Sequence, residues 1–344
     1  MTSGKAPDEN DMQTGRMSSP GVLSRFVDAV SGVACAVPER IGWPAVVALG
    51  WIAARAWCGE RARLRETIGR VYQRLHRPIP RPIDPIIDRM FAHFALNVYE
   101  LLRYPVLTSD DLTGSFELKG LEHLETALAK KRGVILAVPH LGNWELLGAA
   151  IAHRGYPLHS FYLAQKEDEV GGLLDRFRVH SRIVLHDRDR GGMSALKALK
   201  KGEILGMIAD QDGGNLGVYM DFLGHWVSMP AGIANWSLKT GASVVPLFAL
   251  RKGLSRRYTG WFRPALEEPP GVDHAEKAVS RTADIARWFE SVILDHPEQY
   301  LWFYDRFKPR HEGHTARMKK AGVAMRRGGT AYAVGEPGIG EKSR

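Results

Sequence analysis

A histidine and a glutamate stand five positions apart where an apolar run changes into a helix-like segment. In the stretch VILAVPHLGNWELLGAA these residues are His140 and Glu145. Positions five apart on a regular helix lie about 140° from one another, so the two side chains can meet only if the histidine precedes the helix. Pro139 predicts the end of a strand, Gly142 a tight turn, and Asn143 the N-cap of the helix. The pattern therefore predicts a turn that lets Glu145 face back toward the imidazole.

Such a pair suits general acid–base chemistry. The acid would hold one ring nitrogen of His140 and stabilise the imidazolium, while the other nitrogen takes a proton from a hydroxyl. N–H groups at the start of the following helix would favour an oxyanion close by. Three alternatives stay open: a capping turn with an incidental histidine, a metal site that includes His153, and a serine hydrolase. The HExxH and GxSxG motifs are both absent from the sequence, which weighs against the last two.

Further polar candidates follow another apolar run. Asp210 and Asp212 lie in the stretch ILGMIADQDGGNLG, and we predict that they line the site and orient substrate or a helper side chain. Their alternative role is turn formation, because Asp-Gly is frequent in turns. Asn143 is a candidate for substrate contact as well as for the N-cap. The aromatic stretch EQYLWFYDRF, residues 298–307, predicts a packed strand or, alternatively, the wall of an acyl groove.

The elements that must position these residues alternate along the chain beyond about residue 115. Short apolar runs are expected to form strands at 133–138, 158–164, 204–210, 243–251 and 258–267. Amphipathic segments are expected to form helices at 143–153, 171–180, 193–202, 232–241 and 275–296. This alternation predicts an α/β fold with a mixed, mostly covered sheet flanked by helices.

The N-terminal part predicts a membrane-associated helical segment. The longest uninterrupted apolar run, WPAVVALGWIAARAW, is shorter than the ~20 residues that span a bilayer. It contains Trp43, Trp51 and Trp57, and an arginine-rich helical stretch follows it. Aromatic rings at headgroup depth and arginines facing anionic lipid are typical of a helix that lies on a membrane. The alternative is a core helix followed by a solvated one.

Charge and composition set wider limits. The net charge is +9, with a surplus of positive charge in residues 55–82 and 306–344 around a mildly acidic body. Basic regions of this kind fit nucleic acid, anionic lipid or an acidic substrate, or serve solubility alone. Cys35 and Cys58 form no disulfide or metal pattern, which favours a reducing compartment. The expected organisation is disorder over 1–21, the membrane-associated segment over 22–75, a catalytic domain over 76–312 and a basic flexible tail over 313–344. A proline-rich linker is expected at 76–85.

The motif HLGNWELLG resembles the lipid A late acyltransferase family, the lauroyl and myristoyl transferases of lipopolysaccharide synthesis. Mycobacterial phosphatidylinositol mannoside acyltransferase belongs to the same group, and the wider lysophospholipid acyltransferase superfamily shares a histidine followed five positions later by an acid. Other matching stretches come in order: LGWIAARAWCGERARLRETIGRVYQRL, LHDRDRGGMSALKALKKGEILGMIADQDGGNLGVYMDFLG, WSLKTGASVVPLFALR and HPEQYLWFYDRFKPR. Together they cover about residues 45–311.

The resemblance implies a glycerolipid acyltransferase-like fold and an O-acyltransferase whose catalytic pair is His140 and Glu145. It implies acyl carrier protein or acyl-CoA as donor and a hydroxyl of a lipid A-like glycolipid or related membrane lipid as acceptor. No metal or bound cofactor and no nucleic acid partner are expected. The resemblance implies that the protein is located at the cytoplasmic face of the inner membrane. Two other classes stay open: a lipid hydrolase or thioesterase with the same pair, and a non-enzymatic basic binding protein.

One position departs from the family pattern. The family commonly has Tyr-Arg after the second strand, and here Tyr162 is followed by Leu163. A cation for a substrate phosphate must then come from elsewhere. Arg178 is the preferred substitute because an arginine binds phosphate through two parallel N–H bonds. Arg176 and Lys166 are the other candidates.

Overall fold

The structure, a computed structural model, describes residues 22–162, 180–188, 190–307 and 332–334. Three predicted phosphate contacts, Lys166, Arg176 and Arg178, lie outside the described residues. The same holds for most of the helix predicted at 171–180, for the segment 1–21 and for nearly all of the C-terminal tail.

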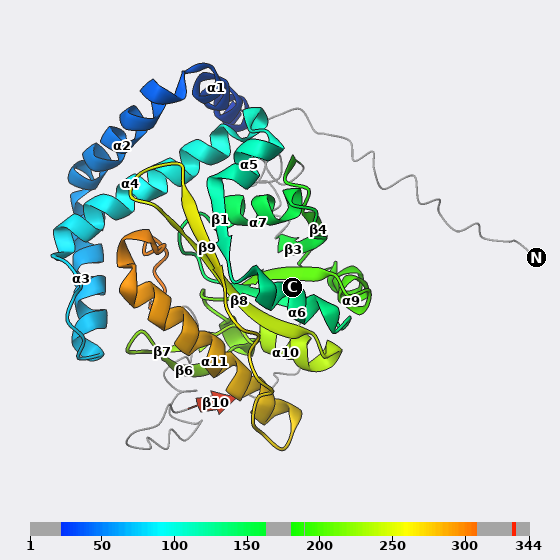
Figure 1. The fold of residues 1–344 in the computed structure, drawn as a ribbon. Coiled ribbons are helices and arrows are strands. Elements are labelled where there is room, and N and C mark those ends of the chain that lie inside the picture. The colour runs from blue at the N-terminus through cyan, green and yellow to red at the C-terminus, as the bar shows by residue number, and fades with distance from the viewer. Residues whose placement is uncertain (1–21, 163–179, 189, 308–331, 335–344) are drawn as a thin grey trace, which may run out of the picture.

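Helices from the N-terminal part lie together along one side of the molecule (Figure 1). They are α1 (Val22–Ala36), α2 (Glu39–Ala56), α3 (Cys58–Arg74) and α4 (Ile83–Leu102). The α2 helix packs closely along α4, because a Cβ on Gly50 would come within 2.8 Å of the Ala92 backbone. The proline-rich linker ends earlier than predicted, since α4 already includes Pro85, a residue that the first turn of a helix tolerates.

No single helix in the described part of the chain is long and apolar enough to cross a bilayer. The helices α2 and α3 would pass that test only as a pair, and they are bent by 86° where they join.

The centre of the fold is a seven-stranded sheet with the order β1-β9-β8-β2-β5-β3-β4. Its strands are β1 (Phe116–Lys119), β2 (Val134–Val138), β3 (Leu158–Tyr162), β4 (Val184–Asp187), β5 (Ile204–Ile208), β8 (Ser243–Arg251) and β9 (Tyr258–Phe262). Neighbouring strands are parallel except β8 and β9. The predicted mixed α/β fold is therefore confirmed. In this order β2 and β5 are neighbours, so their carboxyl ends, followed by His140 and Asp210, meet at one edge.

Both faces of the sheet are buried, which explains why β2 is a continuous apolar run. Ile135 and Ala137 pack into one hydrophobic cluster, and Val134, Leu136 and Val138 into the other. The first cluster is covered by α9 (Gly192–Lys200), α10 (Gly232–Thr240), α11 (His274–Asp295) and parts of α3 and α4. The second is covered by α5 (Ser109–Ser115), α6 (Leu121–Ala129) and α7 (Trp144–His153).

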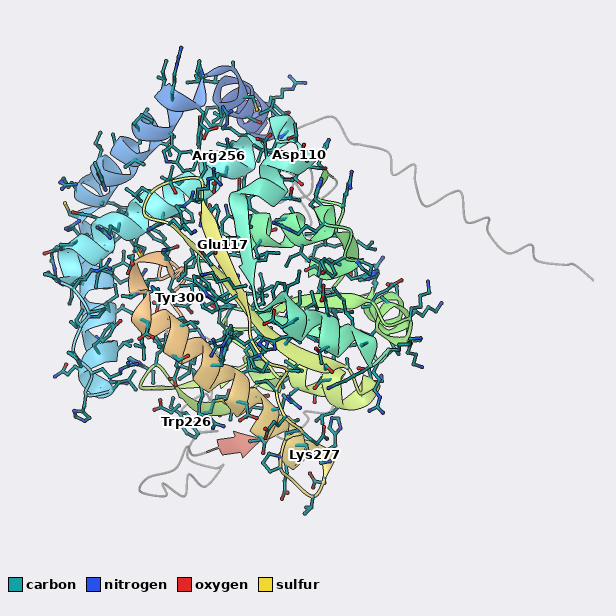
Figure 2. All side chains as sticks on the ribbon, in the orientation of Figure 1. Asp110, Glu117, Trp226, Arg256, Lys277 and Tyr300 are labelled. Carbon is teal, nitrogen blue, oxygen red and sulfur yellow. The ribbon has the colours of Figure 1, made fainter. Side chains whose placement is uncertain are left out.

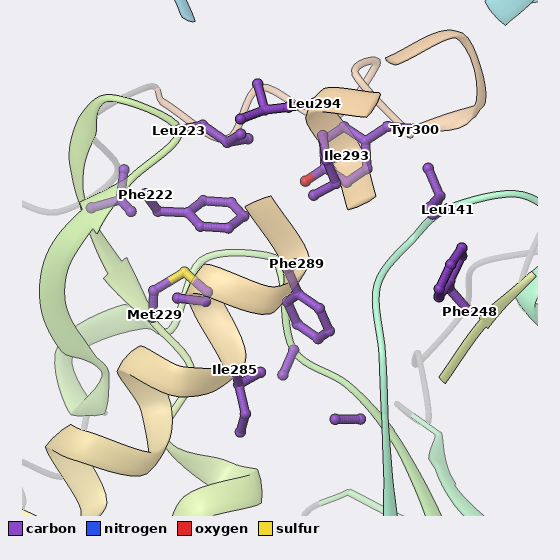
Figure 3. Close-up of a cluster of buried hydrophobic side chains, with 14 of the residues drawn as sticks. Leu141, Phe222, Leu223, Met229, Phe248, Ile285, Phe289, Ile293, Leu294 and Tyr300 are labelled. Atoms are coloured by element: carbon purple, nitrogen blue, oxygen red, sulfur yellow. The ribbon is translucent and has the colours of Figure 1, made fainter. Parts of the chain in front are cut away.

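A small antiparallel sheet, β10 (Tyr332–Val334), β6 (Val218–Phe222) and β7 (His225–Met229), lies against α11. Figure 3 shows Ile293 of α11 between Phe222 of this small sheet and Tyr300, with Phe289 of α11 below them in the same hydrophobic cluster. Short 3-10 turns complete the described elements at η2 (Tyr104–Val106), η3 (Gly214–Leu216) and η4 (Pro297–Gln299). Residues 300–307 form no strand beyond one isolated bridge, so the packed strand predicted there was wrong.

The α11 helix carries a partly buried acid, Glu290, that makes stability depend on pH. Burial raises the pKa of Glu290 from an ordinary value of 4.5 to about 7, and its carboxylate accepts the backbone N–H of Leu223. A raised carboxyl pKa favours the folded state below the unfolded pKa, and this contribution is lost as pH rises through the folded value. We expect the melting temperature of the wild type, measured against Glu290→Gln, to fall between pH 4.5 and about pH 7. Parallel curves for the two proteins would contradict this assignment.

Candidate active site

The turn between β2 and α7 has the geometry that the sequence predicts. Gly142 has φ 66°, and a Cβ there would overlap the carbonyl oxygen of Ala249. Asn143 is the N-cap of α7, and its Oδ1 accepts the backbone N–H of Leu146 at 3.1 Å. His140 therefore precedes the helix, and Glu145 lies in its first turn, as predicted.

The carboxylate bonded to the His140 ring comes from the neighbouring strand. Asp210 Oδ1 lies 2.6 Å from His140 Nδ1, and Asp210 Oδ2 accepts the backbone N–H of His140 at 3.1 Å. A carboxylate only accepts, so Nδ1 carries the proton and Nε2 presents its lone pair. Nε2 is 3.5 Å from the side-chain amide of Gln211, at the outer limit of a hydrogen bond. This leaves Nε2 as the ring nitrogen able to take a proton from a substrate.

Asp210 is a buried carboxylate, with 1% of its surface exposed. Burial alone would raise the pKa of its carboxyl. The hydrogen bonds from the His140 ring and backbone N–H, together with the positive charge that the ring carries when protonated, outweigh this and hold the pKa below its ordinary value. Arg306 supports the same turn, because its Nε donates to the Asp210 carbonyl at 2.8 Å and its Nη2 to the Ser228 carbonyl at 2.7 Å. Burial and the nearby Asp210 raise the pKa of the Tyr300 hydroxyl, so Tyr300 stays neutral beside the carboxylate. Figure 2 shows Tyr300 on the segment after α11.

The imidazole itself is partly open, with 16% of its side chain exposed. Its ring meets the Trp144 ring edge-on at a centroid distance of 4.8 Å. Trp144 also lines a pocket with Met90, Phe94 and Phe303. The base thus stands at the boundary between a polar strand edge and an apolar surface.

The remaining predicted residues lie in this region with different surroundings. Asn143 is 2% exposed, and its Nδ2 donates to Glu100 at 2.8 Å, which favours the capping role over direct contact with substrate. Asp212 follows Asp210 after one residue; its backbone N–H donates to the Tyr304 hydroxyl at 3.3 Å, and its Oδ1 accepts from Gly214. Asp212 therefore shapes the turn. Arg306 was not singled out from the sequence, although it lies in the aromatic stretch that also contains Tyr300.

Among the described residues, no group of three or more histidine, cysteine, aspartate or glutamate side chains is arranged to hold a metal ion. At this site the described residues supply a histidine base, a buried carboxylate and a helix N-terminus.

The model of the bacterial lipid A biosynthesis acyltransferase family matches residues 22–309. The chain belongs to this family. It is 26% identical over 262 residues to a lipid A biosynthesis acyltransferase of Haemophilus influenzae, which covers 75% of this chain and 80% of that protein. It is 26% identical over 279 residues to phosphatidylinositol mannoside acyltransferase of Mycobacterium tuberculosis, covering 75% and 84%. With the lipid A biosynthesis lauroyltransferase of Escherichia coli the identity is 32% over 204 residues, covering 58% and 64%.

This acyltransferase therefore has relatives that act on two kinds of glycolipid. Membership in the family makes it an enzyme that acts on a lipid acceptor and an acyl donor, and the His140 turn lies inside the matched region.

Proposed function

We propose that this acyltransferase moves a fatty acyl group from acyl carrier protein or acyl-CoA to a hydroxyl of a lipid A-like glycolipid or a related membrane lipid. The observation that carries the proposal is the pairing of His140 with buried Asp210 at the carboxyl ends of adjacent parallel strands. It gives a base with one ring nitrogen fixed and the other directed to a substrate.

The proposed step is direct transfer. His140 Nε2 takes the proton of the acceptor hydroxyl as the oxygen attacks the thioester carbonyl. The tetrahedral intermediate collapses, the C–S bond breaks, and the imidazolium returns the proton to the leaving thiolate. The positive end of α7 directly follows the His140–Asn143 turn and favours the negative charge on the intermediate. Glu145 remains proposed as a second acid of the site, and Lys166, Arg176 or Arg178 as the phosphate contact.

We infer that the acyl chain lies against the apolar surface beside His140. The pocket that Trp144 lines also includes Met90, Phe94 and Phe303. Phe303 packs on Phe91 and Phe94 with ring centroids 4.9 Å apart in each case, and Phe94 is 42% exposed. His93, Asn97, Glu298 and Gln299 add polar groups to the same pocket. Aromatic and aliphatic walls beside the base suit the alkyl chain of a thioester.

A transfer assay tests the proposed function. The purified protein is incubated with an acyl donor, either acyl-acyl carrier protein or acyl-CoA, and with an acceptor, either a lipid A precursor or a phosphatidylinositol mannoside. The masses of the lipids are then measured by mass spectrometry. The expected product is an acceptor heavier by one acyl group. We also expect a chelator to leave the rate unchanged, because the proposed step uses no metal. Thioester cleavage that is as fast without any acceptor would indicate a hydrolase instead.

We also propose that α1 and α2 seat the enzyme on the cytoplasmic face of the inner membrane. Ile41, Leu49 and Ile52 share one face of α2 and are 57%, 60% and 61% exposed, while Gly42, Val47, Gly50 and Ala54 on the other face are buried. On α1, Phe26 and Val33 are 63% and 64% exposed. Apolar side chains exposed together in this way are typical of a surface that another apolar phase covers.

The arginines predicted to face lipid have partners within the protein. Arg61 pairs with Asp84 and Asp88, Arg63 with Glu60 and the Trp302 carbonyl, Arg65 with Asp84, Arg70 with Glu66, and Arg74 donates to the Gly224 carbonyl. The pairs of Arg61 and Arg65 join α3 to α4, whereas Arg70 pairs within α3. We therefore take the apolar face of α2 as the main candidate for membrane contact.

The joint variant Ile41→Asn, Leu49→Asn and Ile52→Asn is expected to bind vesicles of phosphatidylethanolamine and phosphatidylglycerol about tenfold or more weakly, because each large apolar side chain contributes ~1.5–3 kcal/mol when fully buried. The matched control is Arg65→Gln with Arg74→Gln, which removes two surface charges and leaves α2 intact. Co-sedimentation measures both. Loss of binding in the control with full binding in the α2 variant would show that charge rather than the apolar face carries attachment.

A further inference from the structure

A buried polar cluster lies directly behind the catalytic turn and joins it to the N-terminal helices. Its centre is the ion pair of Glu100 on α4 with Arg251 at the end of β8, whose side chains are 7% and 1% exposed. Glu100 Oε2 accepts from Arg251 Nη2 at 2.6 Å, and Oε1 accepts from Nη1 at 3.0 Å. The same Oε2 accepts the Tyr258 hydroxyl at 2.5 Å and the Asn143 amide at 2.8 Å.

The cluster forms hydrogen bonds with the turn itself, at the Gly142 backbone and at the side chain of the N-cap residue Asn143. Asn97 Nδ2 donates to the Gly142 carbonyl at 2.7 Å, and Asn97 Oδ1 accepts from Arg251 Nη2 at 2.8 Å. On the other side, the Gly142 N–H donates to the Gln299 carbonyl at 2.9 Å. The Gln299 side chain in turn exchanges two hydrogen bonds with the Arg251 backbone, at 2.8 and 3.1 Å. Gly142 is thus fixed at its N–H and its carbonyl by groups that both converge on Arg251.

Asn143 is fixed in the same way. Its Oδ1 caps α7 and its Nδ2 is held by Glu100, so the amide cannot turn over without losing a bond at each end. The cap sets where α7 begins, and Trp144, the first helical residue, packs on the imidazole. Glu100 therefore acts on the base through Asn143 and the helix start, without contact with the reacting atoms.

The cluster also reaches α2. The Arg251 guanidinium lies over the rings of Tyr258 and Trp43, with distances of 4.6 and 5.3 Å to their centroids. Trp43 on α2 also donates its Nε1–H to the Leu254 carbonyl at 2.5 Å. Beyond it, Arg256 pairs with Glu39 at the start of α2 at 2.5 Å, in the upper region where Figure 2 labels Arg256.

We propose that Asn97, Glu100 and Arg251 are positioning residues for the transfer reaction, which hold the His140–Asn143 turn in the geometry that the base needs. This rests on the proposed function of His140. A shift of about 1 Å at a reacting group can cost about 10²-fold in rate, and a buried cluster that fixes both polar atoms of Gly142 restricts such a shift.

The sharpest test is Asn97→Asp. This isosteric change keeps the oxygen that accepts from Arg251 and adds a negative charge beside a buried cation, but it removes the N–H that holds the Gly142 carbonyl. We expect kcat to fall about 10- to 100-fold, with KM unchanged within about twofold. The melting temperature should fall as well, because the Gly142 carbonyl loses its donor and faces a carboxylate oxygen, so the comparison with a variant destabilised elsewhere on α4 decides the cause of the fall in kcat. Amide exchange should become faster at Leu146 and Leu147, in the first turn of α7.

Asp88→Asn is the matched control, because Asp88 is on the same helix and pairs with Arg61 at 2.5 Å far from the turn. It should lower the melting temperature and leave kcat unchanged. If Asn97→Asp fails to fold, Asn97→Ser, which removes the same donor without adding charge, takes its place. Wild-type kcat in the folded Asn97 variant, or an equal fall of kcat in Asp88→Asn, would overturn the proposal.

The His140→Ala variant distinguishes a failure of the positioning role from a failure of the proposed function. If a folded His140→Ala retains transfer, the proposed role of His140 as the base fails, and with it the reaction that the positioning residues are proposed to serve. If His140→Ala is inactive while Asn97→Asp has wild-type kcat and unchanged exchange at α7, only the positioning role fails.

Discussion

The His140→Ala variant is expected to transfer acyl groups about 10²–10⁴-fold more slowly than the wild type, which is the usual contribution of a general base. The imidazole is the ring whose Nδ1 is bonded to Asp210 and whose Nε2 is partly open. Alanine removes the proton acceptor without altering the turn backbone. Turnover of a thioester donor in the presence of a glycolipid acceptor measures the loss.

The folded state of this variant needs its own control. Removing the imidazole leaves the buried Asp210 carboxylate without the Nδ1–H donor, which costs about 1–3 kcal/mol. His140→Gln keeps a side-chain donor near Asp210 and should retain more stability while remaining inactive. His274→Ala, a change at an exposed histidine at the start of α11, should leave the rate unchanged. Near wild-type turnover in a folded His140 variant would mean that another group deprotonates the acceptor.

The turn that presents the base was predictable because its determinants are local. Pro139, Gly142 and Asn143 each act within a few residues, through strand ending, positive φ and capping. The structure bears out all three, with φ 66° at Gly142 and the Asn143 cap.

The carboxylate bonded to Nδ1 was not predictable by the same reasoning. Asp210 is 70 positions from His140, and only the order of strands in the sheet makes β2 and β5 neighbours. Sequence spacing pointed to Glu145 because it measures distance along the chain. The sequence did contain a signal that could have paired His140 with Asp210. Each of these titratable residues follows an apolar run, and the carboxyl ends of parallel strands share one edge of a sheet.

A hairpin was missed for a different reason. The strands β6 and β7 are joined at Leu223 and Gly224, which have φ 54° and 71°. Hairpin turns of this kind are usually marked by Asn-Gly or Asp-Gly, and a leucine in the left-handed region is uncommon. The partners of the α3 arginines could not be predicted either, because a charge run on a helix does not reveal that Asp84 and Asp88 on α4 will pair with Arg61 and Arg65.

Asp210→Asn is expected to show the second large loss, about 10²–10⁴-fold in kcat, through the tautomer and charge of His140. The asparagine amide fills the same space, but its NH₂ can donate to Nδ1, which places the proton on Nε2 and removes the base. It also lacks the negative charge that stabilises the imidazolium. Asp212→Asn, two positions on in the same turn, is the matched control and should lose much less, because Asp212 bonds to the turn backbone.

Comparison with Glu145→Gln decides which acid serves the base. If Asp210 orients the ring, Asp210→Asn should be the more impaired of the two, and Glu145→Gln should keep most of the rate.

The dependence of stability on pH gives a second measurement. The pKa of Asp210 lies below its ordinary value of 3.8, so the stabilisation from its pairing is present above that value and is lost as pH falls through the lower folded pKa. The stability gap between wild type and Asp210→Asn should therefore narrow in acid. Full activity in Asp210→Asn together with an inactive Glu145→Gln would assign the base's partner to Glu145 and leave Asp210 a structural role.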